Sequence, residues 1–298
     1  MKKLLVILLL AATITSAQSA GATGLSFLKL GSGARNIGIA DFGSMNGNDI
    51  SNYFYNPALI ALNNTTRFSF THNQQLFDLG SSSISVASNV WGLPLALNVN
   101  TTSVDNIEIR SQSGPATATF NANFFAATLG SGFKFDDNLS AGIAIKFIYE
   151  EMLNQDASGL GFDFGIVYKG FVENLSLGTS LRNIGSMSEL AKESTNLPSD
   201  FRFGGEYSYP LESAKLNLIG LAGFQKYLEE DNSHIHTGLE VIYDDFFAIR
   251  GGYITGYESK SLTAGFGVQW KGFKIDYAYV PFEYGLGDNT SFTVSYTF

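Results

Sequence analysis

The sequence predicts an all-β protein, a 14-stranded antiparallel transmembrane β-barrel with an N-terminal hatch or plug segment. Three observations lead to this prediction. From Thr66 to Phe298, apolar residues alternate with small or polar ones, which is the period of a strand whose two faces meet different surroundings. Short and long connections also alternate along this region. After the first residues, no run of roughly 18–20 apolar residues could form a membrane-spanning helix.

The first residues have the layout of a signal peptide. Met1-Lys2-Lys3 is followed by the apolar run 4–12 and by small residues that end at Ala17, so we expect cleavage after residue 17. The formal net charge is −9, which disfavours a nucleic-acid partner. The chain has no cysteine, which excludes disulfides and thiolate chemistry and fits an exported envelope protein.

The segment 261–270 shows the alternation most clearly. Leu262, Phe266 and Trp270 fall on one face, and Thr263 and Gln269 on the other. Strands that cross a bilayer at a tilt need about 9–11 residues. We expect fourteen of them: 66–73, 82–89, 93–102, 117–134, 139–150, 159–168, 174–183, 200–209, 215–226, 234–243, 246–254, 261–270, 273–281 and 291–298. The third could extend through residues 104–110.

The connections indicate the orientation of the barrel. Outer-membrane barrels have short periplasmic turns and longer outer loops. The connections 90–92, 135–138, 169–173, 210–214, 244–245 and 271–272 are short, whereas most of the alternate set, such as 103–116, 184–199 and 282–290, are longer. The pattern predicts a bacterial outer-membrane barrel, surrounded by lipid, with both termini in the periplasm.

The last strand carries an assembly signal. Phe292, Val294, Tyr296 and the terminal Phe298 share one strand face. This resembles the C-terminal strand by which barrel-assembly machinery recognises its substrates. As the open edge of a soluble sheet, such a strand would invite aggregation, so we expect it to close the barrel against the first strand.

Charged residues gather on the predicted inner face. A lipid-facing Arg or Lys at the membrane midplane costs roughly 2–4 kcal/mol, so charges within strands should point inward. The predicted lumen charges are Lys146, Arg202, Glu206, Glu240, Arg250, Lys274 and Asp276. Because both signs are mixed, we expect a compensating network rather than the single-sign ring of a selective channel.

The sequence gives little support for catalysis or for bound metal. His234 and His236 share a strand face with Glu240, a spacing that could bind a metal ion. A structural zinc site usually requires four protein ligands, so we expect hydrogen bonding instead. No G-x-S-x-G motif accompanies the histidines. We therefore predict no enzyme, no cofactor and no metal site.

Residues 18–64 do not follow the strand period, and we expect them to form a periplasmic hatch before a barrel of residues 65–298. Gly31-Ser32-Gly33 lacks the strand and helix of a phosphate-binding loop and fits a tight turn. Arg35 is expected to have an internal ion-pair partner, because its burial alone would be costly. Asn56-Pro57-Ala58 is typical of a turn, with gating as the alternative.

These residues carry a family resemblance. The stretch Phe27 to Arg35, followed by Gly38 and by Asn56-Pro57-Ala58, resembles the amino-terminal signature of the PorV/PorQ family, which is itself similar to FadL-type transporters. The ending 276–282 also looks familial. The resemblance implies a 14-stranded barrel with a luminal hatch. The implied hatch motif comprises Gly31, Gly33, Ala34, Arg35, Gly38, Asn56, Pro57 and Ala58.

Two functions follow from the resemblance. PorV/PorQ-type barrels imply an accessory component of type IX protein secretion and surface attachment, with secreted cargo or other secretion components as partners. FadL-type relatives imply the alternative, passive transport of hydrophobic small molecules, with a hydrophobic ligand.

Overall fold

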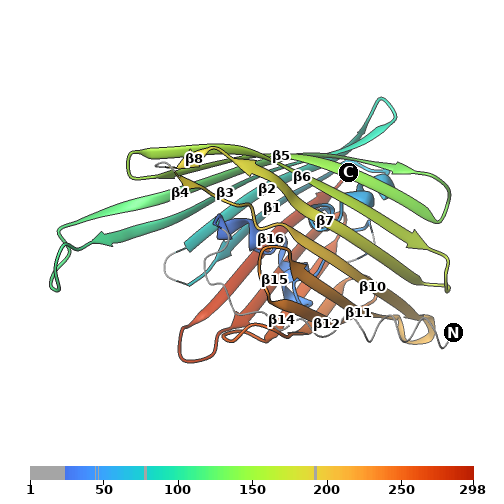
Figure 1. Cartoon of the computed structure of the whole chain (residues 1–298). Coiled ribbons are helices and arrows are strands. Elements are labelled where there is room, and N and C mark those ends of the chain that lie inside the picture. Colours follow the sequence, from blue (N-terminus) through green and yellow to red (C-terminus); the bar gives the residue numbers. More distant parts are fainter. Residues whose placement is uncertain (1–23, 44, 46, 77–78, 191–192) are drawn as a thin grey trace, which may run out of the picture.

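The chain folds into a closed, antiparallel barrel of fourteen strands in the part that the computed structural model describes (Figure 1). That part comprises residues 24–43, 45, 47–76, 79–190 and 193–298. The predicted fold class and strand number are confirmed. The predicted signal peptide, residues 1–17, lies outside the described residues. Within them, no helix is long and apolar enough to cross a membrane.

The strands agree closely with the predicted ranges. The barrel strands are β1 (Arg67–Gln74), β2 (Leu79–Val90), β3 (Leu93–Ile109), β4 (Ala118–Lys134), β5 (Leu139–Met152), β6 (Gln155–Lys169), β7 (Leu175–Met187), β10 (Asp200–Leu211), β11 (Leu216–Tyr227), β12 (Ser233–Tyr243), β13 (Phe247–Ile254), β14 (Leu262–Trp270), β15 (Phe273–Pro281) and β16 (Asp288–Thr297). The short pair β8 (Glu189–Leu190) and β9 (Glu193–Ser194) lies in the connection from β7 to β10, and η4 (Glu212–Ala214) lies in the next turn.

The two faces of the wall differ as the alternation predicts. Along β14, Leu262, Phe266 and Trp270 are exposed, whereas Thr263 is buried. On β10, Phe203 points outward and Arg202 inward. An exposed apolar outer face and a buried polar inner face suit a barrel whose outside meets lipid.

The barrel has two different ends. The turn rim carries short connections, such as Trp91-Gly92 and Lys271-Gly272, and the loop rim carries most of the longer ones, although its connection between β5 and β6 is only Leu153-Asn154. The hairpin of β3 and β4 extends beyond the loop rim (Figure 1). A bulge lies between Val104 and Ile107, where Asn106 has φ of +57°, and it lets β3 continue to Ile109.

Exposed aromatic residues mark the turn rim. Trp91, Phe135, Phe171, Phe246 and Trp270 lie in or beside its turns, and each side chain is exposed. Aromatic side chains are enriched where a membrane-spanning barrel meets the interface between lipid and water. The turn rim therefore has the composition of a membrane boundary.

The barrel closes between its first and last strands. β1 pairs with β16 from Arg67–Thr297 to Gln74–Thr290, and the Phe298 amide donates to the Thr66 carbonyl. Phe292, Val294 and Tyr296 occupy alternate positions on the outer face of β16. Because β1 and β16 pair with each other, neither is left with the open edge of a soluble sheet.

The described chain begins and ends at opposite rims. The Gly24 amide donates to Asn196 in the loop-rim connection, whereas Phe298 lies at the turn rim. The prediction that both termini share the periplasmic side depends on residues 18–23, which lie outside the described residues.

Replacing Ile145 by Lys tests the lipid-facing assignment of the outer wall. Ile145 is exposed in the middle of β5, so its replacement should lower the free energy of unfolding by about 2–4 kcal/mol. Equilibrium unfolding in lipid vesicles measures the effect. Glu151→Lys, near the loop-rim end of the same strand, is the control and should change little. Equal effects of the two substitutions would contradict the assignment.

Candidate functional site: a hatch segment in the barrel lumen

Residues 24–64, which we call the hatch segment, run through the inside of the barrel from the loop rim to the turn rim (Figure 1). The segment contains η1 (Ser26–Lys29), α2 (Ala34–Gly38), η2 (Ile50–Phe54) and η3 (Pro57–Leu62). α2 lies against β13 to β16, and η3 lies against β3 to β6. The hatch segment therefore contacts much of the inner wall.

Inward-facing glycines on the wall make room for the hatch segment. A Cβ at any of these positions would overlap the hatch segment or contact it closely. Several pair across neighbouring strands, as Gly142 does with Gly165 and Gly204 with Gly223. We call the set the glycine belt: Gly130, Gly132, Gly142, Gly165, Gly178, Gly204, Gly223, Gly238, Gly252 and Gly265.

Phe42 shows how the belt works. Its ring is fully buried. A Cβ on Gly204 would lie 2.5 Å from the ring and a Cβ on Gly223 would lie 2.3 Å from it, so either would overlap the ring. The glycine pair thus forms a flat seat for one aromatic ring. Close packing of this kind stabilises the interior through many small dispersion contacts.

The Asn56-Pro57-Ala58 motif fixes the end of the hatch segment to the wall. Asn56 Oδ1 accepts from the Ala58 amide (3.0 Å), which caps η3. Its Nδ2 donates to the carbonyls of Ile166 (3.1 Å) on β6 and Thr179 (3.2 Å) on β7. One side chain therefore both starts a helix and joins it to two strands.

The residues around Arg35 form a tight turn. Gly33 has φ of +79°, a conformation that favours glycine, and a Cβ there would overlap Ser51. The Ala34 amide donates to Thr293 Oγ1 (2.8 Å) on β16. Gly38 packs against Gly265 of β14, with 3.3 Å between the Gly38 Cα and the position of a Cβ on Gly265. The turn places α2 directly on the wall.

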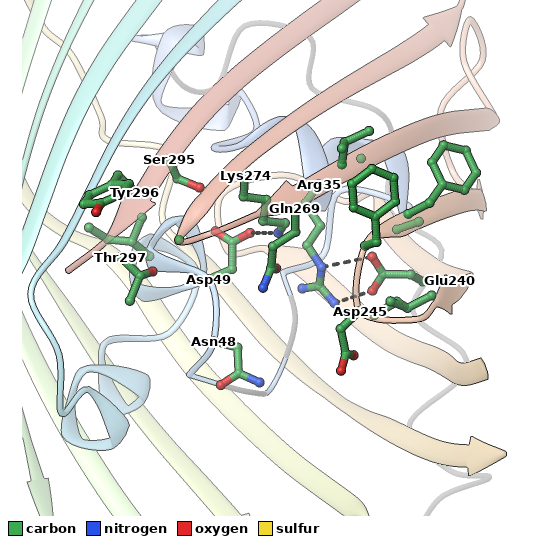
Figure 2. Close-up of a pocket in the computed structure, with 18 of the residues that line it drawn as sticks. Arg35, Asn48, Asp49, Glu240, Asp245, Gln269, Lys274, Ser295, Tyr296 and Thr297 are labelled. Atoms are coloured by element: carbon green, nitrogen blue, oxygen red, sulfur yellow. Dashed lines mark hydrogen bonds and ion pairs between the residues drawn. The ribbon is translucent and has the colours of Figure 1, made fainter. Parts of the chain in front are cut away.

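A chain of alternating charges begins and ends in the hatch segment and runs through the wall, and Figure 2 shows its two end contacts, Arg35 with Glu240 and Asp49 with Lys274. Arg35 of the hatch segment binds Glu240 of β12, which also binds Arg250 of β13. Arg250 Nη1 lies 2.8 Å from Asp276 Oδ1 of β15. Lys274 then bridges Asp276 (3.3 Å) and Asp49 of the hatch segment (2.9 Å). We call these six residues the charge chain.

The charge chain is buried, so water and salt screen its ion pairs only weakly. The Glu240 side chain is 0% exposed and that of Arg35 is 6% exposed. Burial alone would raise the pKa of the Asp49 carboxyl, but Lys274 and Arg35 hold that pKa well below its usual range. Asp49 therefore stays ionised, and it also caps η2 by accepting from the Ser51 amide (3.0 Å).

A second ion group binds the backbone of the hatch segment. Asp200 of β10 pairs with Arg182 (2.8 Å) and Arg202 (2.7 Å). Arg182 Nη1 also donates to the Phe54 carbonyl (2.9 Å). Arg202 Nη1 donates to the carbonyls of Asp41 and Phe42, each at 3.3 Å. The wall arginines thus satisfy carbonyls of the hatch segment that would otherwise lack partners.

The remaining predicted lumen charges also face inward. Lys146 of β5 lies 3.2 Å from Asp163 of β6 and donates to Asn183 of β7. Glu206 of β10 accepts from the Met45 amide (3.3 Å) of the hatch segment. The seven predicted lumen charges therefore face inward, but they lie in separate groups: the charge chain, the ion group around Asp200, and the contacts of Lys146 and of Glu206.

The two histidines lie in a hydrogen-bond network. His236 Nδ1 is 2.6 Å from the Ala40 carbonyl, and its Nε2 is 3.1 Å from Gln225. His234 Nδ1 lies 3.0 Å from the Thr255 carbonyl, and its ring stacks on Tyr257 with 3.9 Å between centroids. Among the described residues, no group of three or more His, Cys, Asp or Glu could hold a metal ion.

An apolar cluster occupies the loop-rim half of the lumen. The rings of Phe27 of η1 and Phe124 of β4 stack with 5.2 Å between centroids. We call the whole set the apolar chamber, and its buried residues are Leu25, Phe27, Ala126, Ile148, Ala157, Met187 and Leu197. A lumen lined in this way is unusual for a water-filled channel, whose interior is polar.

Cavities lie on both sides of the hatch segment. A cavity of about 540 Å³ at the turn rim is lined by charge-chain residues and by Asn48, Asp245 and Gln269 (Figure 2). A second cavity, of about 70 Å³, is lined by Phe27 and Ala126 and by polar side chains such as Asn98, Lys146 and Asp163. The turn-rim cavity, which we call the polar vestibule, lies at the opposite end of the lumen from the apolar chamber.

Several of these residues were not predicted from the sequence. Asp163, Asp200 and Arg182 lie on the inner face of strands, but single charged residues in an alternating pattern do not reveal their partners. Asp49 lies in a region without strand period. The glycines of the belt were visible as small residues on one face, and only their pairing across strands shows what they accommodate.

Comparisons with solved structures identify the same fold. The toluene transporter TodX of Pseudomonas putida matches with a TM-score of 0.62 at 10% identity, over 96% of this chain and 99% of that one. The toluene transporter TbuX of Ralstonia pickettii matches with 0.61 at 12% identity, over 90% and 98%. A FadL homologue of Pseudomonas aeruginosa matches with 0.54 at 14% identity, over 94% and 99%.

Sequence comparisons add no relative. No protein-family model matches the chain, and no curated protein matches it. The structural matches share the fold of this chain, and at identities of 10–14% they show the fold alone. The resemblance of the N-terminal motifs to the PorV/PorQ family stays a prediction from the sequence.

Replacing Gly142 by Ala tests the glycine belt. A Cβ at this position would overlap the Pro57 backbone, so overpacking should cost about 1–3 kcal/mol in unfolding free energy and expose the hatch segment to protease. Gly220→Ala on β11 is the control, because nothing lies within 4 Å of a Cβ there. Wild-type protease resistance in Gly142→Ala would argue against the belt.

Replacing Glu240 by Gln tests the charge chain. The substitution leaves Arg35 and Arg250 without their shared carboxylate, and breaking a buried pair in this way typically costs about 3–5 kcal/mol. Equilibrium unfolding in vesicles measures the loss, with the exposed Glu212→Gln as the control. A change below about 0.5 kcal/mol would show that the chain contributes little.

Proposed function

We propose that this protein is an outer-membrane channel for the passive entry of hydrophobic small molecules. The observation that carries the proposal is the apolar chamber, a buried cluster in which Leu25 and Phe27 of the hatch segment pack on the wall at the opposite end of the lumen from the polar vestibule. Porin-type lumens are polar throughout. An apolar chamber on the loop-rim side suits the capture of molecules that partition poorly into water.

The orientation follows from the connections. Short turns face the periplasm in outer-membrane barrels, so the turn rim is assigned to the periplasmic side and the loop rim to the outside. A hydrophobic molecule then enters the apolar chamber from outside and meets the hatch segment. The fold shared with the toluene transporters supports this use of the lumen.

The closed lumen makes movement of the hatch segment a requirement of transport. The charge chain and the glycine belt hold this segment in one position, so entry needs a rearrangement of part of it. The charge chain lies in the turn-rim half, whereas the apolar chamber lies at the other end. In this proposal the residues from η1 to Leu30 move while α2 stays bound, and their movement breaks the Lys29–Glu230 ion pair and the stacking of Phe27 on Phe124.

Uptake by cells with a locked hatch segment tests the proposal. A Cβ on Gly24 would lie 3.6 Å from the Thr195 Cβ, within the range of a disulfide, and the chain has no native cysteine. Gly24→Cys with Thr195→Cys therefore offers a cross-link that fixes the start of the hatch segment, next to η1, at the loop rim. Cells that lack a hydrocarbon channel should take up labelled toluene faster when they express the wild type. Oxidation of the double variant should slow uptake, and reduction should restore it.

Two controls complete the experiment. Each single-cysteine variant should transport toluene whether oxidised or reduced. The proposal is refuted if cells expressing the wild type take up toluene no faster than cells with an empty vector, although the barrel is present and folded in their outer membrane.

A second hypothesis is an accessory role in type IX secretion, which rests on the resemblance of residues 27–38 and 56–58 to the PorV/PorQ family. The hairpin of β3 and β4 beyond the loop rim is the surface that a secretion partner would meet. The structural matches are transporters and do not support this role. If deletion of the gene leaves cargo secretion unchanged, this hypothesis is rejected.

A further inference from the structure

One buried carboxylate lacks a partner in the described lumen. Glu150 of β5 faces inward and is 3% exposed, yet its Oε1 has no hydrogen-bond partner and the side chain has no ion pair among the described residues. The other buried acids differ from it. Asp163, Asp200, Glu240 and Asp276 each face a lysine or arginine, and Glu206 accepts a backbone amide.

The surroundings of Glu150 are apolar. Its cross-strand neighbours are Phe124 on β4 and Ala157 on β6. Ala157 belongs to the apolar chamber, and Phe124 packs against that chamber. A carboxylate in such surroundings is costly unless a cation or a hydrogen-bond donor reaches it. Buried polar groups without partners often mark a binding site.

Glu150 also lies where a ligand from outside would arrive. β5 ends at Met152, so the residue is close to the loop rim. Phe27 of η1 packs on Phe124, the cross-strand neighbour of Glu150, so η1 covers this part of the wall on its luminal side.

We propose that the apolar chamber binds hydrophobic molecules that carry a protonated amine, with Glu150 as the counter-ion. The apolar body of the ligand would pack on Phe124 where Phe27 packs now, and the ammonium would donate to the Glu150 carboxylate. This inference rests on the proposed function and narrows its substrate class.

The chemistry favours an ammonium over other polar groups. A carboxylate only accepts hydrogen bonds, and a bond between two opposite charges in apolar surroundings is stronger than one to a neutral donor. A fatty acid would bring a second negative charge to Glu150, which disfavours its binding. The site should therefore rank an ammonium first, an alcohol second and a carboxylate last.

Binding of three eight-carbon probes tests the site. Full-length protein in nanodiscs is titrated with octylammonium, 1-octanol or octanoate, and binding to empty nanodiscs is subtracted. The wild type should bind octylammonium about tenfold more tightly than octanoate, and Glu150→Gln should remove about this factor. Glu151→Gln is the matched control, because Glu151 is the exposed neighbour on the outer face.

Either of two results would overturn the proposal. The first is equal affinity of the wild type for octylammonium and octanoate. The second is a Glu150→Gln variant that becomes more stable while its probe affinities stay unchanged, because that result would make Glu150 a structural defect.

Failure of this site and failure of the proposed function can be told apart. Uptake of octane requires the channel but not the carboxylate. If cells that express the wild type take up octane faster than vector controls without preferring octylammonium, only the site is refuted. If octane uptake does not rise at all, the channel function is refuted.

Discussion

The buried contact between Arg35 and Glu240 is the interaction on which the arrangement of the lumen depends. Removing a guanidinium from water is costly, and the cost is offset only when a carboxylate and further hydrogen bonds replace the water. Glu240 supplies the carboxylate and also pairs with Arg250. Asp276 then pairs with Arg250 and with Lys274, and Lys274 pairs with Asp49 of the hatch segment. Both ends of the charge chain belong to the hatch segment, so the chain ties the segment to three wall strands, β12, β13 and β15.

The glycine belt supplies the space that this electrostatic contact needs. Charges bind over short distances, and α2 reaches the wall only because residues such as Gly265 have no side chain. The same absence on β5 and β6 admits Pro57 and Asn56 at the opposite side of the lumen. Shape and charge therefore act on the same segment. The part around η1 lies outside the charge chain and is held by Phe27 in the apolar chamber and by the ion pair of Lys29 with Glu230.

The sequence was sufficient to predict the wall and insufficient to predict the lumen. Strand alternation reports which face of a strand meets lipid, so most strand ranges agree with the structure within about four residues. The third strand runs seven residues past its predicted end at residue 102, through the extension to 104–110 that the sequence left open. The partners of Arg35 depend on how fourteen strands close, which no local pattern encodes. Glu150 was missed for the same reason, because its lack of a partner is a property of the assembled interior.

The polarity of the lumen changes at the hatch segment, from an apolar chamber near the loop rim to a charged vestibule near the turn rim. A channel for ions or sugars would present a continuous polar path. We therefore propose that the hatch segment seals the lumen against water-soluble molecules and still lets an apolar molecule approach from the loop rim. The seal requires that α2, η2 and η3 stay in place in the resting protein.

Conductance across a planar lipid bilayer tests this seal most directly. Single barrels of the wild type should pass almost no ionic current, whereas a variant that lacks residues 24–64 should show large, stable conductance steps of an open fourteen-stranded barrel. Conductance steps of equal size in both proteins would contradict the account, because they would show that the hatch segment does not close the lumen.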